Sequence, residues 1–415
     1  MRKQTSQSVG SGAQLAVAPS SAFAPLREPL FRSLWTAAVI SYTGSWMQNV
    51  ATGWLMSSLT TSPIWVSLVQ VAVSLPVFLI ALPAGALADM VDRRKFLLLT
   101  QSSMVAAAGI LGALTVARAV TPQLLLVFTF LLGVGAVMND PAWQALTPDL
   151  VPPEELGTAV ALNSAGFNMA RAVGPGLGGL VIATEGTGVA FLLNALSFFG
   201  VILFLYRWKP SPSARVIPQG VNKISGAIGA GIRYMRQDRR MRAVLVRTLA
   251  FSLSASAFWA LLPLLARAYG AAGYGVMLAF FGLGALVGAS LLARARHLLS
   301  LDSMVALATV IFAVSLCFLV RTRNLTLSSL LAAAAGLAWI STLATLNFVA
   351  QTTAPSWVRA RMISMYVLVL QGGLALGSAL WGVVAARVGL GSTLTSAAVA
   401  LVCGLLLAPW YRLAA

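Results

Sequence analysis

Three ionisable side chains lie inside long apolar stretches of this sequence, and they are the residues best placed to do chemistry. Asp140 and Arg171 lie deep within the stretches 122–147 and 156–183, whereas Arg247 lies near the start of a later one. Burying a charge in apolar surroundings costs free energy, so a lone carboxylate there can bind and release a proton. We therefore predict that Asp140 exchanges protons. The long side chain of Arg247 is expected to reach water.

An ion pair between Asp140 and Arg171 is not expected, because the two residues lie at different depths. Counted from the turn near Pro152, Asp140 is 12 residues along one helix and Arg171 is 19 along the next. At about 1.5 Å per residue, their depths differ by ~10 Å. Two roles stay open for Arg171, orienting its helix or attracting an anionic substrate. For Asp140 the alternative is a carboxylate satisfied by polar neighbours such as Asn163, which bends its helix together with Pro141.

The elements that must hold these residues are membrane-spanning helices. Of the 415 residues, 59% are hydrophobic and only 9% are charged, and no soluble domain can bury so much apolar surface. Each spanning helix needs roughly 20 apolar residues, and the apolar segments are 18 to 29 residues long without strict alternation. We predict an all-α polytopic membrane protein with twelve transmembrane helices in two pseudo-symmetric six-helix bundles. The segments are 31–56, 63–88, 96–117, 122–147, 156–183, 188–206, 243–266, 274–293, 303–320, 325–350, 358–386 and 390–411.

Four parts are expected along the chain. Residues 1–25 lack periodicity and are predicted to be a disordered cytoplasmic arm. Residues 26–206 and 243–415 form the two bundles. Residues 207–242 form a cytoplasmic linker, in which isoleucines repeat at helical spacing beside arginines. This pattern predicts an amphipathic helix on the anionic inner leaflet.

The distribution of basic residues predicts the orientation. With both termini in the cytoplasm, 21 of the 28 lysines and arginines fall in cytoplasmic segments, five fall outside and two lie within helices. This bias follows the positive-inside rule. It also accounts for the net charge of +18 without a nucleic-acid partner.

An internal repeat relates the two halves of the sequence. A single offset of 203 residues superposes eight landmarks without a gap. The pairs are Gly85 and Gly288, Arg93 and Arg296, Gly133 and Gly336, Pro152 and Pro355, Gly174 and Gly377, Gly179 and Gly382, Gly186 and Gly389, and Gly188 and Gly391. Parallel repeats of this kind place a substrate near the midplane between the halves.

Two motifs resemble those of the major facilitator superfamily. Residues 85–95 read Gly-Ala-Leu-Ala-Asp-Met-Val-Asp-Arg-Arg-Lys and resemble its helix 2–3 signature, and residues 171–179 resemble the helix 5 motif of its antiporters. The stretches 140–152 and 354–361 resemble the enterobactin-exporter branch, a group of proton-driven effluxers that includes macrolide efflux proteins. The resemblance implies a secondary active transporter that exports a small siderophore- or drug-like organic molecule across the inner membrane. It would do so by proton antiport with alternating access.

The charged cluster after residue 85 is expected to form a cytoplasmic gate. Asp89 could meet the positive N-terminal end of the helix that begins near Val358, and Arg93 could pair with Asp149. The alternative is a topology anchor only. Met90 stands where the signature has a base, and Leu292 replaces the acid in the second half, so the gate should be asymmetric. The candidate gate residues are Gly85, Asp89, Asp92, Arg93, Arg94 and Asp149.

Small residues and midplane polar residues complete the candidate sites. Small residues allow helix backbones to approach closely, and aromatic and amide side chains suit a large, partly apolar ligand. The candidate helix-interface residues are Gly174, Pro175, Gly178, Gly179, Gly288 and Gly377. The candidate substrate-binding residues are Gln48, Asn49, Trp143, Gln144, Trp259, Asn347, Tyr366 and Gln371.

Other function classes lack the residues that they need. No Gly-Lys pair occurs for a phosphate loop, and a single histidine, His297, with ten acids provides no catalytic cluster. Cys317 and Cys403 lie in apolar runs, and no metal site or cofactor is expected. A non-transporting scaffold or sensor and a proton-coupled importer remain as alternatives. The expected partners are the substrate, protons and the lipid bilayer, and the protein is expected to be a monomer.

Overall fold

The computed structural model describes residues 22–144, 146–208 and 238–413, except for the side chains of a few residues within helices. Every regular element in these residues is a helix, as the sequence predicts. The first group of long helices is α1 (Pro29–Leu59), α2 (Pro63–Met90), α3 (Arg93–Val116), α4 (Pro122–Gln144), α5 (Leu156–Thr184) and α6 (Thr187–Arg207). The second group is α8 (Arg239–Leu265), α9 (Gly270–Leu298), α10 (Leu301–Leu319), α11 (Leu325–Thr353) and α12 (Ser356–Leu405).

Eight stretches of the described residues are long and apolar enough to cross a membrane. Two of them, Arg239–Leu298 and Arg361–Leu405, span 60 and 45 residues and each holds more than one helical segment. The expected linker helix and most of the expected N-terminal arm lie outside the described residues. Residues 24–27, at the end of that arm, form a 3-10 helix.

The predicted helix boundaries agree with the structure to within a few residues, except in α12. This helix has 50 residues but is broken at Gly389, where φ is +81°. The predicted last segment, 390–411, is too long, because the helix ends at Leu405 and turns follow. Gly186, which precedes α6, also has a positive φ of +90°. Glycine adopts this conformation at little cost, and the two glycines are related by the 203-residue offset.

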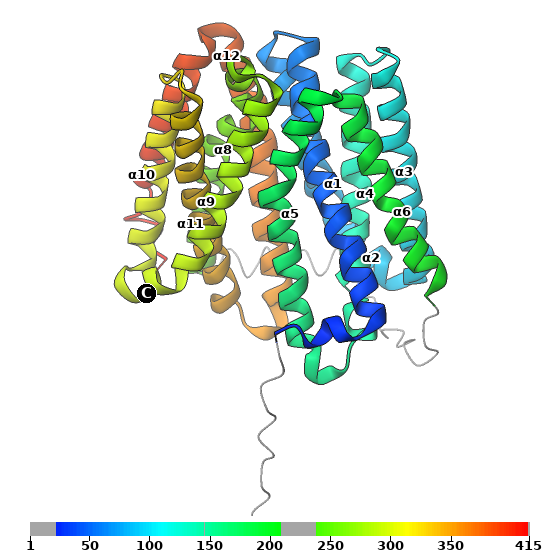
Figure 1. Ribbon diagram of the computed structural model, residues 1–415. Helices are drawn as coiled ribbons and strands as arrows, with labels where there is room; N and C mark the ends of the chain where they lie inside the picture. Colours follow the sequence, from blue (N-terminus) through cyan, green and yellow to red (C-terminus); the bar gives the residue numbers. More distant parts are fainter. Residues whose placement is uncertain (1–21, 145, 209–237, 414–415) are drawn as a thin grey trace, which may run out of the picture.

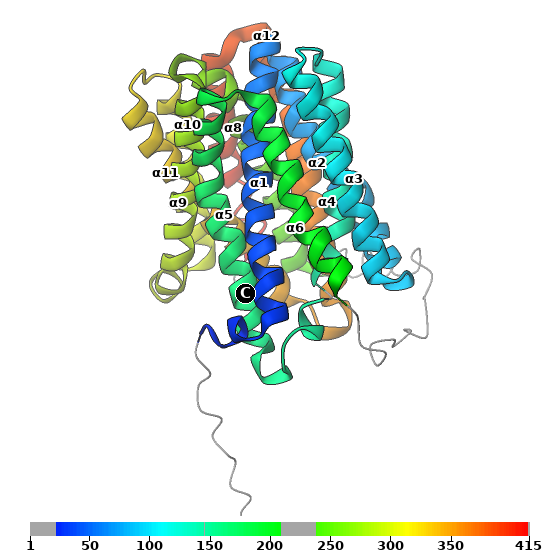
Figure 2. The same cartoon turned by 45° about the vertical axis from the view of Figure 1, so that its right-hand side comes forward.

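The two helix groups lie side by side and meet along two crossings (Figures 1 and 2). Within the first group α1 packs on α5 and α6, α3 on α4 and α6, and α2 on α4. Within the second group α8 packs on α12, α9 on α11, and α10 on both α11 and α12. Between the groups, α2 packs against α12 and α5 against α9.

Glycines related by the repeat make equivalent contacts within their groups. A Cβ added at Gly174 would lie 3.1 Å from the Thr43 carbonyl oxygen on α1, and one at Gly377 would lie 2.2 Å from the Leu253 carbonyl oxygen on α8. Gly133 packs similarly on α2, and Gly336 packs on α9. The absence of a side chain lets these backbones touch. The internal repeat of the sequence is therefore also a repeat of helix packing.

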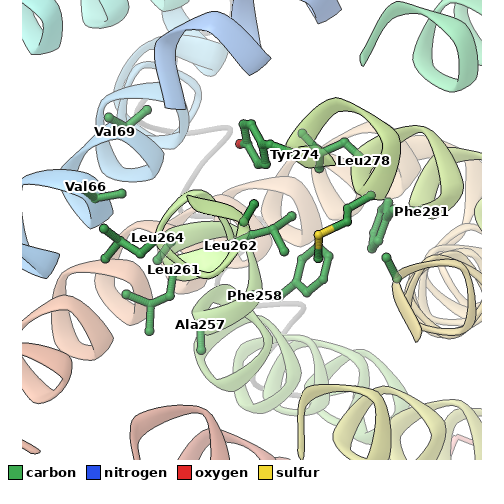
Figure 3. Packing of buried hydrophobic residues seen from close by; sticks show 14 of the residues in the cluster. Val66, Val69, Ala257, Phe258, Leu261, Leu262, Leu264, Tyr274, Leu278 and Phe281 are labelled. Carbon is green, nitrogen blue, oxygen red and sulfur yellow. The ribbon is translucent and has the colours of Figure 1, made fainter. Parts of the chain in front are cut away.

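The buried apolar side chains are distributed unevenly between the two ends of the molecule. One large cluster contains residues of both groups and extends from the middle of the helices to the upper end, where α1 ends. Figure 3 shows part of it, where Val66 and Val69 of α2 lie near side chains of α8 and α9. At the lower end, where α1 begins, the described residues form separate clusters. One lies within the first group around Leu97 and Leu146, and the other within the second group around Val244 and Leu346. Among the described side chains, a shared apolar cluster joins the groups at the upper end, and none of the clusters at the lower end contains residues of both groups.

Polar contacts between the groups are also found at the upper end. Arg267, which follows α8, donates hydrogen bonds to the carbonyl oxygens of Ser57 and Thr60 at the end of α1. Trp54 of α1 stacks on Tyr274 of α9 with ring centroids 6.5 Å apart. These contacts hold the upper ends of α1 and the second group together.

A buried ion pair fixes the lower end of the second group. Arg247, buried on α8, pairs with Asp302 at the start of α10. The Asp302 carboxylate also accepts a hydrogen bond from the Leu413 backbone N–H at 3.1 Å. The sequence predicted that Arg247 reaches water. This prediction was wrong, because Asp302 lies within reach of Arg247 inside the protein.

Replacing Arg247 by methionine is expected to destabilise the folded protein by about 3 kcal/mol. Removing one partner of a buried ion pair leaves the other charge uncompensated and costs roughly 3–5 kcal/mol; the low end applies because the Asp302 side chain is 26% exposed. Thermal unfolding of the purified protein measures the effect. Arg242→Met, at an exposed position on the same helix, is the matched control. Equal loss of stability in both variants would contradict the assignment.

Candidate functional site

A cavity of about 320 Å³ lies between the two helix groups. Its walls come from α1, α2 and α5 of the first group and from α8, α9, α11 and α12 of the second. The aromatic side chains in its lining are Trp46, Phe167, Trp259, Tyr274, Phe281 and Trp339. Amides are supplied by Asn49, Gln70 and Gln371. A largely aromatic wall with a few amides is typical of sites for small organic molecules.

Arg171 carries the charge of this cavity. Its guanidinium carbon lies 5.7 Å from the ring centroid of Trp46 on α1 and 6.0 Å from that of Phe281 on α9. Contacts at this range are favourable between a cation and an aromatic face. The buried Nε atom has no hydrogen-bond partner. The guanidinium is thus held by aromatic rings from both helix groups while this donor remains unused.

Asp140 lies away from this cavity, on the opposite side of an aromatic chain. Asp140 does not line the cavity. It also forms no ion pair with another described residue. Trp143, three residues after Asp140 on α4, contacts Tyr42 on α1 edge-on with ring centroids 6.5 Å apart. Tyr42 contacts Phe167 edge-on at 5.3 Å, and Phe167 contacts Trp46 at 6.2 Å. Trp46 in turn lies beside Arg171.

Asp140 is exposed and lies four residues before α4 ends at Gln144, not deep within its helix as the sequence predicted, because turns follow α4. Leu131 and Val127 form an exposed apolar stripe on α4, whereas Ala136 and Asp140 form a second exposed stripe. Each residue of the second stripe lies nine positions after a residue of the first. At about 100° per residue, such pairs point in opposite directions. The neighbouring Asn139 accepts a hydrogen bond from Gln101 on α3 at 3.0 Å. Asp140 is therefore accessible on the side of α4 that faces away from the apolar exterior.

The described gate candidates make contacts within the first helix group. The Asp92 carboxylate accepts a hydrogen bond from the Lys95 backbone N–H and caps α3. Arg94 donates to the carbonyl oxygens of Leu205 and Tyr206 at 2.6 Å, which ties α3 to the end of α6. The backbones of Gly85 and Asp89 lie at the end of α2, and the side chain of Asp89 lies outside the described part of the structure.

The expected pair between Arg93 and Asp149 is not formed in the described structure. The prediction placed Asp149 at the end of the fourth helix. Instead α4 ends at Gln144, and Asp149 lies in a separate 3-10 turn, Thr147–Asp149, where its side chain is exposed. This turn removes Asp149 from the helix end that the prediction assumed.

The candidate interface residues fall into two sets. Gly174 and Gly178 pack against α1, Gly288 packs against α11 and Gly377 packs against α8, all within one helix group. Gly179 instead meets Gly275 of α9, where an added Cβ would lie 2.7 Å from the Gly275 Cα atom. Pro175, also on α5, lines the cavity. Gly179 and Pro175 are thus the members placed between the groups.

Of the eight candidate substrate-binding residues, three line the cavity: Asn49, Trp259 and Gln371. The others lie elsewhere. Gln48 accepts a buried hydrogen bond from Asn194 of α6 at 2.6 Å. Tyr366 donates to the Leu343 carbonyl oxygen at 3.0 Å. Trp143 is part of the lower apolar cluster, Gln144 is exposed on α4 and Asn347 bonds Gln351 on its own helix.

Several cavity residues were missed by the sequence predictions. Trp46 and Gly53 were missed, although they lie at helical spacing from the predicted Asn49; Gln70 and Ser74 were also missed and have the same kind of spacing, and all of them line the cavity. This spacing places them on one face of α1 and one face of α2. Helical spacing could therefore have predicted these cavity-lining residues, whereas choosing polar residues one by one missed them.

Comparison with known proteins agrees with these features. Over 381 residues the chain is 22% identical to the staphyloferrin A transporter of Staphylococcus aureus, covering 89% of this chain and 93% of that protein. It is 28% identical to the enterobactin exporter EntS of Salmonella typhi, covering 91% and 89%. It is 27% identical to the multidrug efflux pump Tap of Mycolicibacterium fortuitum, covering 88% and 91%.

Among solved structures, the fold is similar to that of a bacterial homologue of the human lysosomal transporter Spinster, in an inward-facing and unoccupied conformation. The TM-score is 0.72 at 14% identity, with 93% of this chain and 96% of that chain covered. The described residues share the fold of this transporter, and a family model of the major facilitator superfamily matches the chain, so the protein is a membrane transporter of that superfamily and not an enzyme.

Within the superfamily, the model of one family matches residues 20–415. The chain belongs to the transmembrane secretion effector family. This confirms the resemblance inferred from the sequence motifs.

Proposed function

We propose that this protein exports a small organic molecule across the inner membrane by proton antiport with alternating access. The observation that carries the proposal is the placement of the cavity. Side chains of both helix groups line it, one shared apolar cluster forms much of its wall, and the described residues at the lower end form separate clusters. A site between two groups that are joined at one end is the arrangement that alternating access requires.

The proposed architecture has twelve transmembrane helices in two six-helix bundles, residues 26–206 and 243–415. The equivalent glycine contacts of the two groups and the break at Gly389 support this division. The distribution of the basic residues supports a cytoplasmic location for both termini. In this proposed orientation the lower end faces the cytoplasm, and the separate clusters of described residues there support an inward-facing state.

Asp140 is the proposed proton-coupling group. It is an exposed carboxylate on the side of α4 opposite the apolar stripe, near the lower end, where in the proposed inward-facing state it would exchange protons with the cytoplasm. An ionisable group within a membrane span is costly to retain without a function. The candidate gate around Asp89 would close the lower end in the opposite state. Export as the direction is supported by the exporter and efflux relatives.

Transport in inside-out membrane vesicles with an imposed pH gradient tests this function. Vesicles with acidic interiors are expected to accumulate a labelled siderophore or hydrophobic drug, and to lose protons as they do so. Vesicles that lack the protein are the control. Absence of both cargo accumulation and proton movement for every compound would favour a scaffold or sensor. Cargo movement in the reverse direction under the same gradient would identify an importer.

A further inference from the structure

The charge of the cavity has a single sign. Among the described residues that line it, Arg171 alone is charged, and no carboxylate is present. Asp140, the carboxylate that the sequence analysis considered as a partner, forms no ion pair with Arg171. A guanidinium in such surroundings is stabilised when an anion binds it, because burial of an unpaired charge is unfavourable.

The hydrogen-bonding groups of Arg171 point to a ligand. A guanidinium has five N–H donors in a planar fork that matches the two oxygens of a carboxylate. In the described structure Arg171 makes aromatic contacts with Trp46 and Phe281, and its buried Nε has no acceptor. The aromatic contacts fix the position of the cation without supplying an anionic partner.

The alternative, that Arg171 only orients its helix, is weaker. The crossing of α5 and α9 is made by backbone atoms at this position. A Cβ added at Gly282 would lie 2.9 Å from the Arg171 carbonyl oxygen and 3.0 Å from the Ala172 Cα atom. The helix is therefore already positioned by close backbone packing, and the Arg171 side chain extends into the cavity wall.

We propose that the cargo is an organic anion with an aromatic or apolar body, whose carboxylate or comparable acidic oxygen group binds Arg171. The inference rests on the proposed transport function. Trp259 and Trp339 provide apolar faces for the body of the molecule, and Asn49 and Gln371 provide hydrogen bonds to its polar substituents. The same positive charge disfavours organic cations in this low-dielectric site. The pocket thus selects by charge as well as by size.

Binding of three probes of similar shape and different charge tests the proposal. They are 1-naphthoate, its neutral amide 1-naphthamide, and the cation 1-naphthylmethylammonium. Binding to the purified protein is followed by quenching of tryptophan fluorescence, since three tryptophans line the cavity. Naphthoate is expected to bind at least tenfold more tightly than the amide, and the cation more weakly than either. Equal affinity for the anion and the amide, tighter binding of the cation, or binding of none of the three would overturn the proposal.

Variants of Arg171 locate the selectivity. R171Q is expected to weaken naphthoate binding at least tenfold and to leave naphthamide binding unchanged, whereas R171K retains part of the preference for the anion. Equal weakening of both probes by R171Q would indicate a packing role and contradict the proposal. The comparison of probes on the unaltered protein does not depend on whether R171Q folds.

The test separates this inference from the transport proposal. Charge-selective binding without any movement driven by a pH gradient would refute proton antiport and leave the anion site standing. Gradient-driven export of neutral or cationic compounds, without selective binding of naphthoate, would refute the anion site and leave proton antiport standing.

Discussion

Replacing Asp140 by asparagine is expected to abolish export driven by a pH gradient while leaving cargo binding intact. Asparagine has nearly the same shape but cannot take up or release a proton. Because Asp140 does not line the cavity, the affinity for cargo should change by less than about twofold. Export of cargo against its own concentration gradient, driven by the pH difference, should fall by at least tenfold. Exchange of cargo down its concentration gradient should continue.

The measurement compares the two activities in the same proteoliposomes at equal protein content. Asn139→Ala is a useful control on the neighbouring residue, since it removes the hydrogen bond to Gln101 but no carboxylate. If Asp140→Asn still exports against a gradient in response to the pH difference, Asp140 is not the coupling group. Asp140→Glu, which keeps the carboxylate, should retain part of the coupled activity.

Adding a methyl group at Gly179 is expected to shift the protein away from the state described here. The new Cβ would lie 2.7 Å from the Gly275 Cα atom and 3.0 Å from the Ala271 carbonyl oxygen, so α5 and α9 would have to separate. Overpacking of this kind costs roughly 1–3 kcal/mol. If that cost falls only on the conformation described here, the ratio of this conformation to the alternative one falls by about 5- to 150-fold. Transport should decline accordingly, because the upper end no longer closes properly.

Gly176→Ala is the matched control on the same helix. A Cβ there meets nothing nearer than the Ala279 Cβ atom at 3.5 Å, which is ordinary contact. Access to the cavity is measured as the labelling rate of Asn49→Cys by a membrane-impermeant maleimide added from outside, with Cys317 and Cys403 replaced by serine. Gly179→Ala should raise this rate at least tenfold and Gly176→Ala should not. Unchanged labelling in both would mean that this crossing does not set the conformation.

Much of the fold follows from local patterns in the sequence. The apolar segments predicted the helices to within a few residues, because crossing a bilayer requires a minimum apolar length whatever the neighbours. Gly186 and Gly389 occupy equivalent positions and both adopt a positive φ, as the internal repeat implies. The prediction failed where hydropathy continues beyond the helix, at residues 406–411, since apolar residues there form turns rather than another helical turn.

The site was harder to predict. Gln48 and Asn49 are adjacent polar residues, yet Asn49 lines the cavity and Gln48 bonds Asn194 within the first group. Neighbouring residues on a helix point about 100° apart, so their roles depend on how the helix is rotated. That rotation is set by tertiary packing, here by glycines of α5 against α1.

The sequence by itself determined the class of protein, the positions of the helices, the repeat and the few intramembrane charges, because these depend on composition and spacing along one chain. Only the tertiary structure decided what surrounds those charges. It placed Arg247 against Asp302 and left Asp140 accessible. It also brought Phe281, from the second helix group, to Arg171 of the first. Contacts between residues so distant in sequence arise from the packing of whole helices, and no local pattern encodes them.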